Sequence, residues 1–274
     1  MDPEVLQAVV DQVDAEQVIE LSRGALRIPS YSGEEEEVAR YFQRSMADAG
    51  LDSEIQPVPE SAMMGPSANA IGRLKGSGGG RTLMFNGHID HNPVCDGWTK
   101  DPFGGVVEDG WLFGFVHMKA ANATYIAAVD AVRRAGVPLK GDVVLANVCG
   151  ELRGGAGTQH ALREGLTADW FVLGEPTELT LGFNHTASLV TRLHVRGRMK
   201  HFATVEVEGS KGINAVEKAA KLIARLAPSH TPIPPVAEGG WLTFEPRLGF
   251  EGLPQINIGP IRGGISSSYD EGRP

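Results

Sequence analysis

Three short apolar runs in this chain each lead into a side chain that can bind a metal or carry a proton. They end near His88, Glu151 and Glu175, and stretches of helical periodicity separate them. Alternation of strands with helices predicts an α/β fold with a mostly parallel sheet. Ligands of such sheets bind where strands end and loops begin, so the three side chains are expected to face one crevice.

The surrounding pattern supplies the other elements of this first domain. Residues 4–28 have the spacing of one or two packed helices, and Ser32 with Glu35 forms a Ser-x-x-Glu capping box before a helix that ends at Gly50. The remaining expected elements are strands 68–71 and 82–85, paired as a hairpin across the glycine-rich turn 76–80, then helix 120–135, strand 142–148, helix 158–165 and strand 170–173.

Near residue 186 the pattern changes. A two-period run at 189–195, an amphipathic helix at 213–226, a proline-rich loop and a strand at 255–258 predict a second, smaller α+β domain. The expected domains are therefore 1–186 and 187–274.

Charge and cysteine content narrow the function classes. The formal net charge of -9 argues against a nucleic-acid or anionic-membrane surface, which leaves small-molecule or peptide partners. The acidic start does not match a secretory signal, and no apolar run reaches bilayer length. The only cysteines, Cys95 and Cys149, form neither a disulfide framework nor a zinc motif, which favours a reducing, cytoplasmic location.

The clearest local signal for chemistry is Gly87-His88-Ile89-Asp90. Residues two apart on a strand point to the same side, so Asp90 can orient the imidazole of His88 as the second group of a metal site. Glu151 precedes a glycine-rich turn and is placed to act as a base, and Glu175 follows a third strand. Taken alone, the His88 motif is equally compatible with a surface histidine, and each Glu is more often a solvated strand-end charge, but the three together favour a site.

These motifs in their order resemble the M20 peptidase family of zinc-dependent amidohydrolases, which includes acetylornithine deacetylase, succinyl-diaminopimelate desuccinylase, aminoacylase and glutamate-type carboxypeptidases. The segments that carry the resemblance are Gly87 to Asp90, Trp98, Asp101 to Phe103, Asp109-Gly110, Gly114, Met118-Lys119, Glu151 with Gly154 to Gly157, and Gly174 to Thr177. The resemblance implies a zinc-hydrolase catalytic domain at 1–186 and an inserted α+β lid domain at 187–274 that forms a homodimer. Family members continue into a closing catalytic segment, so both domains are expected to be incomplete here.

By this resemblance, His88 ligates a metal, Asp90 orients it, Glu175 is a further ligand and Glu151 is the general base. His201, within a segment that resembles the family's lid, is expected to reach across the dimer and stabilise the oxyanion. His91, His160 and His185 have no such support, and packing or surface roles are expected for them.

Two positions depart from the family pattern. His117 stands where the family has a bridging Asp, and Leu152 stands where it has the second metal's Glu. A neutral imidazole does not easily bridge two cations, and Leu152 has no lone pair. His88, His117 and Glu175 therefore predict a two-histidine, one-carboxylate site for one ion rather than two, with zinc favoured and manganese or cobalt also compatible.

The expected function is metal-dependent hydrolysis of a C–N amide bond in a small N-acyl amino acid, dipeptide or similar carboxylate, with Glu151 as general base. Three alternatives remain open. They are a family aminohydrolase acting on a non-acyl C–N bond such as that of an aryl amine, a non-catalytic relative that binds a small ligand, and a cysteine hydrolase using Cys149.

Overall fold

The computed structural model describes residues 2–63, 65–177, 179–182, 189–201, 212–226, 258–259 and 261–264. It divides the chain into two compact units, Met1–Asn184 and His185–Pro274. The domain boundary predicted from the sequence, after residue 186, lies beside this division. None of the helices in the described part of the chain has the length and apolar character that a membrane span needs.

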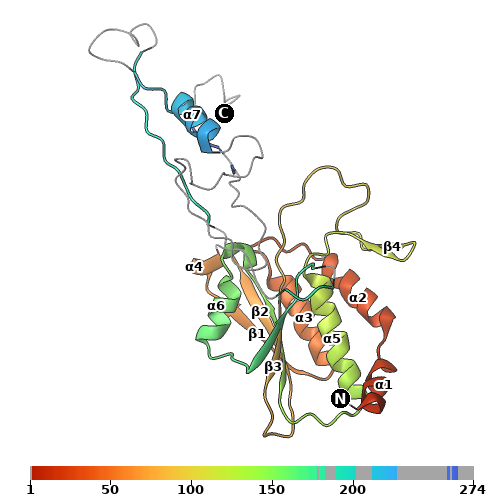
Figure 1. Ribbon diagram of the computed structural model, residues 1–274. Helices are drawn as coiled ribbons and strands as arrows, with labels where there is room; N and C mark the ends of the chain where they lie inside the picture. Colours follow the sequence, from red (N-terminus) through yellow and green to blue (C-terminus); the bar gives the residue numbers. More distant parts are fainter. Residues whose placement is uncertain are drawn as a thin grey trace, which may run out of the picture. The chain divides into compact units, whose positions relative to one another are not determined.

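A five-stranded sheet forms the centre of the first unit (Figure 1), in the order β1-β2-β6-β3-β7. Its strands are β1 (Asp52–Val58), β2 (Ser67–Leu74), β3 (Leu83–His88), β6 (Val143–Val148) and β7 (Trp170–Leu173). β6 and β7 both pair with β3 in parallel, and β2 pairs antiparallel with both β6 and β1. Four strands therefore run in one direction and only β2 is reversed, which confirms the predicted α/β class with a mostly parallel sheet.

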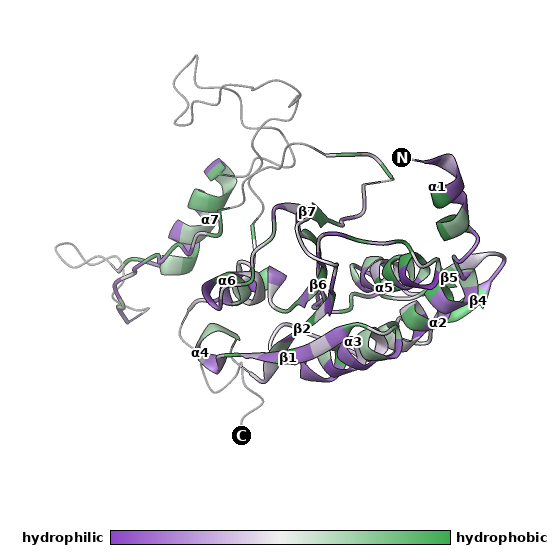
Figure 2. Cartoon of the chain, turned by 90° about the horizontal axis from the view of Figure 1, so that it is seen from below, coloured by the Kyte–Doolittle hydropathy of each residue, from purple (hydrophilic) through white to green (hydrophobic). Residues whose placement is uncertain are grey.

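Helices cover the sheet unequally on its two faces. Figure 2 shows α2 (Ala15–Leu26), α3 (Glu36–Asp48) and α5 (Lys119–Arg134) on one face and α6 (Ala156–Arg163) on the other. The larger buried cluster, which includes Phe42, Met46, Ile126 and Leu145, fills the three-helix face. The other elements of this unit are α1 (Pro3–Val10), α4 (Glu60–Met63), the 3-10 helix η1 (Glu151–Arg153) and a separate two-stranded sheet of β4 (Val106–Glu108) and β5 (Trp111–Phe113).

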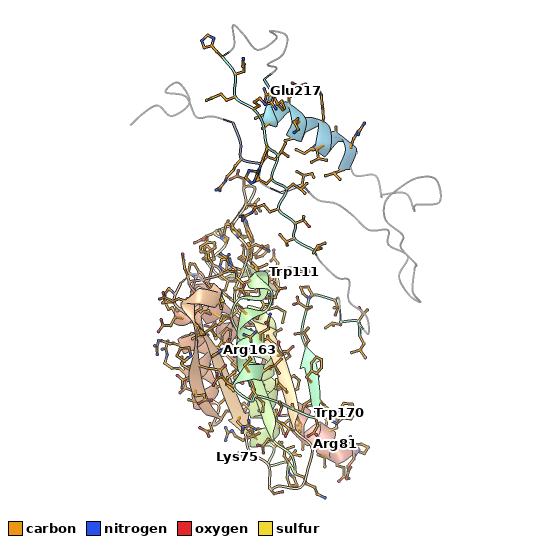
Figure 3. The ribbon with its side chains drawn as sticks, turned by 90° about the vertical axis from the view of Figure 1, so that its left-hand side faces the viewer. Lys75, Arg81, Trp111, Arg163, Trp170 and Glu217 are labelled. Atoms are coloured by element: carbon orange, nitrogen blue, oxygen red, sulfur yellow. The ribbon has the colours of Figure 1, made fainter. Side chains whose placement is uncertain are left out.

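β7 is one of the two edge strands, and its four residues Trp170–Leu173 are all exposed. The guanidinium carbon of Arg81 lies 5.5 Å from the ring centroid of Trp170, and Figure 3 shows the two side chains beside each other. This cation–π contact covers part of the indole while leaving more than half of the side chain exposed.

The hairpin predicted between strands 68–71 and 82–85 is wrong. β2 and β3 do not pair with each other, because β6 lies between them and bonds to both. The glycine-rich turn instead pairs with the approach to β6: Ser77 N–H donates to Leu139 O at 2.8 Å and Gly78 N–H donates to Lys140 O at 2.9 Å. The chain between β2 and β3 therefore crosses the end of β6, which lies between the two strands that it connects.

The predicted capping box is also wrong. α3 begins without a side-chain cap, and Glu35 and Ser32 form hydrogen bonds elsewhere in the fold. Ser32 donates to Asp90 and Glu35 accepts the Gly150 N–H, so contacts with residues distant in the chain replace the local cap that the sequence pattern indicates.

The second unit contains α7 (Ala215–Leu226) as its described helix. Asn214 Oδ1 accepts the backbone N–H groups of Val216 and Glu217 at 2.9 and 3.2 Å, which caps the helix. Residues 189–195 form no strand in the described structure, and an isolated bridge joins Arg198 to Ile213. Most of the predicted strand 255–258 lies outside the described residues.

Candidate active site

The carboxyl ends of the three parallel strands meet at one edge of the sheet. His88 is the last residue of β3 and lies opposite Val148, the last residue of β6, while Glu151 and Glu175 follow β6 and β7 by a few residues. The structure therefore brings together the three strand-end side chains that the sequence pattern singled out, as the parallel directions of the strands require.

His88 is held in one orientation from its Nδ1 side. The ring is 3% exposed, Nδ1 lies 2.9 Å from the backbone oxygen of Asp90 and 3.4 Å from its Oδ1. Nε2 is directed to Glu175, with its Oε1 3.8 Å away. Burial alone lowers the pKa of His88, but the hydrogen bond and charge of Asp90, with the charges of Glu175 and Glu151, raise it above the ordinary value.

His117 lies beside His88. The two ring centroids are 4.5 Å apart in an edge-on arrangement, and burial, together with the neighbouring His88, lowers the pKa of His117. A lowered pKa keeps this imidazole neutral and able to donate a lone pair. Its backbone has φ +36, a conformation that non-glycine residues seldom adopt and that is concentrated at functional sites.

The Nδ1 atom of His117 is buried and has no hydrogen-bond partner in the described structure. A buried polar atom without a partner carries a desolvation cost, and a cation at that position would satisfy it. Two ligand atoms at tetrahedral zinc are roughly 3.3 Å apart, so the 3.8 Å between His88 Nε2 and Glu175 Oε1 is close to that spacing. Two imidazoles and one carboxylate are ligands that divalent metals accept, and His88 lies close to both of the other two residues.

The expected convergence of His88, His117 and Glu175 on one point is nevertheless incomplete. Among the described residues no three His, Cys, Asp or Glu side chains come together tightly enough to form a ready-made metal site. Glu175 is partly exposed, so its side chain is the member of the set with most room to move.

Asp90 joins His88 to the turn that carries Glu151. Its Oδ1 accepts the Glu151 N–H at 3.0 Å, and its Oδ2 accepts the Leu152 N–H at 3.1 Å and the Ser32 hydroxyl at 2.8 Å. Burial opposes ionisation of this carboxyl, but the hydrogen bonds from His88, the two N–H groups and Ser32 lower its pKa to about 2. Asp90 therefore stays ionised and fixes both the imidazole and the turn.

Glu151 begins the 3-10 helix and has an exposed side chain. Its negative charge favours the protonated forms of both His88 and His117, which for His117 partly opposes the lowering of its pKa by burial.

Cys149, two residues earlier, is fully buried, and burial together with the charges of Glu35 and Asp90 raises its thiol pKa. A buried thiol with a raised pKa does not act as a nucleophile near neutral pH, which argues against the cysteine-hydrolase alternative.

Three supporting residues were missed or misassigned from the sequence. Asn122, on α5, donates its side-chain N–H to the backbone oxygen of His88 at 2.9 Å. Ser32 and Glu35 were assigned to a helix cap, yet Ser32 donates to Asp90 and Glu35 accepts the Gly150 N–H at 3.2 Å.

The other histidines take several roles. His91 is buried: the Ser30 N–H donates to its Nε2 at 2.9 Å, and its Nδ1 lies 2.7 Å from Asn92 O, so it packs as a neutral ring. His160 lies within α6, and His185 is outside the described residues. His201 belongs to the second unit, and its expected role across a dimer stays a prediction.

Comparison with known sequences gives a consistent set of relatives. A family model described as "Peptidase family M20/M25/M40" matches residues 84–262. An N-formyl-4-amino-5-aminomethyl-2-methylpyrimidine deformylase of Bacillus subtilis is 30% identical over 73% of this chain and 48% of its own length. A succinyl-diaminopimelate desuccinylase of Cereibacter sphaeroides is 33% identical over 76% of this chain and 56% of its own length. The chain thus spans about half the length of these relatives.

Two solved structures share the fold. A tripeptidase from Staphylococcus aureus covers 83% of this chain and 59% of its own with a TM-score of 0.52 at 17% identity. Human carnosine dipeptidase 1 covers 64% of this chain and 42% of its own, also with a TM-score of 0.52, at 19% identity.

Proposed function

Because the chain belongs to peptidase family M20/M25/M40, we propose that it acts as a metal-dependent hydrolase of a C–N amide bond in a small N-acyl amino acid, dipeptide or similar carboxylate. The observation that carries the proposal is that His88 lies beside both His117 and Glu175, while Asp90 joins it to the turn that presents Glu151. The curated relatives named above are a deformylase and a desuccinylase, which supports an acyl-type substrate.

His88, His117 and Glu175 would hold one divalent ion, with zinc preferred and manganese or cobalt compatible. Such an ion supplies Lewis acidity, which polarises a carbonyl and makes water a stronger acid. His88 would bind through Nε2, since Asp90 occupies its Nδ1. His117 offers its buried, unpartnered Nδ1, and Leu152 provides no carboxylate for a second ion.

Glu151 would take the proton from the attacking water and pass it to the leaving amine nitrogen. Asp90 supports this role because it holds the Glu151 N–H and therefore fixes where the side chain starts. The proton is carried by the exposed Glu151, whereas Asp90 remains an ionised acceptor of hydrogen bonds because its pKa is about 2. His201 of a partner subunit would stabilise the oxyanion, and dimerisation through 187–274 and a cytoplasmic location belong to the same proposal.

The test is hydrolysis of a panel of N-formyl, N-acetyl and N-succinyl amino acids and dipeptides by the purified chain. We expect amine release that stops after chelation and returns with added zinc, manganese or cobalt. Glu151→Gln should lose most of the activity, whereas the matched control Glu164→Gln, at the exposed end of α6, should keep it.

The alternatives predict different results in the same assay. Release of ammonia or amine from aryl amines, without cleavage of any acyl substrate, would indicate an aminohydrolase acting on a non-acyl bond. Saturable binding of the same compounds by metal-loaded protein, without turnover, would indicate a non-catalytic relative and would contradict the proposal.

A further inference from the structure

Glu35 is a fully buried carboxylate that the proposed chemistry does not use. Its Oε2 accepts the Gly33 N–H at 2.8 Å and the Ser67 hydroxyl, and its Oε1 accepts the Gly150 N–H at 3.2 Å. One side chain therefore joins the loop before α3, the start of β2 and the turn after β6.

Two carboxylates accept hydrogen bonds from the Gly150 turn. Glu35 takes the Gly150 N–H, and Asp90 takes the next two, those of Glu151 and Leu152. Gly150 has φ +69, so the chain turns here in the left-handed region and three consecutive N–H groups are available to acceptors. The side chain of Glu151 leaves the backbone in the middle of this clamped segment.

Stability alone is a poor reason for a carboxylate at position 35. The described residues provide it with no ion pair, and Asp90 is a second buried carboxylate close enough to oppose its charge. Burial and Asp90 accordingly raise the pKa of Glu35, while its hydrogen bonds to Ser67 and Gly33 oppose the rise. Hydrogen bonds to a charged acceptor are stronger and shorter than those to a neutral one, which is what a rigid turn requires.

We propose that Glu35 is a positioning residue for the general base. Its hydrogen bond from the Gly150 N–H, together with the hydrogen bonds that Asp90 accepts from the next two N–H groups, fixes the direction in which Glu151 faces the metal site. This inference rests on the proposed function, in which Glu151 moves the proton. In the described part of the chain the hydrogen bonds of Glu35 go to Gly33, Ser67 and Gly150, and none goes to His88, His117 or Glu175.

The test uses the full chain and three variants. Glu35→Ala removes both acceptor oxygens. Glu35→Gln keeps one acceptor oxygen for Gly150 but places an N–H₂ group opposite the Ser67 hydroxyl or the Gly33 N–H. Glu37→Gln is the matched control, because Glu37 is an exposed carboxylate in the first turn of α3.

The first measurement needs no substrate. In amide hydrogen exchange by NMR, the Gly150 N–H of Glu35→Ala should exchange at least about tenfold faster than in the native chain, since a hydrogen bond to a charged group is lost. The Leu145 N–H, in the middle of β6, should keep its native rate. An equal acceleration at Leu145 would mean general loosening and would overturn the positioning role.

The second measurement is the hydrolysis of the N-acyl amino acid panel. We expect kcat to fall about 10- to 100-fold in Glu35→Ala with KM and metal content unchanged, and Glu35→Gln to recover part of the loss. A native kcat in Glu35→Ala, in a chain that is active, refutes the role of Glu35 and leaves the proposed function standing. A native chain without activity refutes the proposed function and the positioning of a base with it.

If Glu35→Ala does not fold, Ser67→Ala provides the same comparison in milder form. It removes one donor to Glu35 and leaves the Gly150 turn itself unchanged. The same pattern, faster exchange at Gly150 and a lower kcat at constant KM, is expected with a smaller amplitude, and native values for both would overturn the proposal.

Discussion

Replacing Asp90 by Asn should destabilise the first unit by about 2.5 kcal/mol at neutral pH. Asn has the same shape but no charge, and it can direct only one oxygen toward the three donors that bond to the carboxylate. The magnitude follows from the pKa of Asp90, which the fold lowers from 3.8 to about 2. Each unit of pKa difference between folded and unfolded chain corresponds to about 1.4 kcal/mol, because the folded state then favours the ionised form by that amount.

The dependence on pH has a definite sign. A carboxyl whose folded pKa is lowered stabilises the fold above its unfolded pKa, and this contribution is lost as the pH falls through 3.8 toward about 2. The difference in unfolding free energy between the native chain and Asp90→Asn should therefore shrink below pH 4. Between pH 8 and pH 5 it should grow as the pH falls, because Asp90 also raises the pKa of His88 and so stabilises its protonated form.

Urea denaturation of both proteins in the presence of a chelator measures this difference without any contribution from bound metal. Asp96→Asn is the control, since Asp96 is an exposed carboxylate on the loop after the site. A loss below about 0.5 kcal/mol, the usual range for surface changes, would refute the account of Asp90 as the acceptor that fixes the turn. A loss that persists unchanged at pH 2.5 would refute its ionic basis.

The remaining predictions concern close contacts at the site and the base. Gly87→Ala should strongly destabilise the chain, because a Cβ there would lie 2.2 Å from Asn122 Oδ1, and thermal unfolding checks this. Gly174→Ala should also destabilise it, since its Cβ would lie 2.1 Å from the Tyr125 hydroxyl, and Tyr125→Phe in the same chain should recover part of the loss. Glu151→Gln should lower kcat by about 10²–10⁴-fold and leave the bound metal in place, as measured by steady-state kinetics and elemental analysis.

Much of the site could be predicted from the sequence because parallel strands present their carboxyl ends together. Once the runs before His88, Glu151 and Glu175 are assigned to such strands, their meeting needs no further information. The contact of His88 with Asp90 is similarly local, although Nδ1 bonds to the backbone oxygen of Asp90 at 2.9 Å and lies 3.4 Å from the carboxylate that the pattern singled out.

Other features depend on partners that are distant in the chain. β6 lies between β2 and β3, although more than fifty residues separate it from either of them, and a local turn pattern cannot show this insertion. β1 was missed because its residues are mixed in polarity and include Pro57, features that weaken a strand assignment but are tolerated at the edge of a sheet. Ser32 and Glu35 match a helix cap in sequence, yet their acceptor and donors, Asp90 and the Gly150 turn, come from β-strand loops.

The metal content of the purified chain tests the central claim most directly. Elemental analysis after zinc loading and desalting should find one ion per chain. His88→Ala and His117→Ala should retain little zinc after the same treatment, because each loses a ligand and its affinity for zinc should fall at least about 100-fold. His160→Ala, on α6, should match the native chain. Two ions per chain, none, or a full complement in His117→Ala would contradict a single-ion centre built from His88, His117 and Glu175.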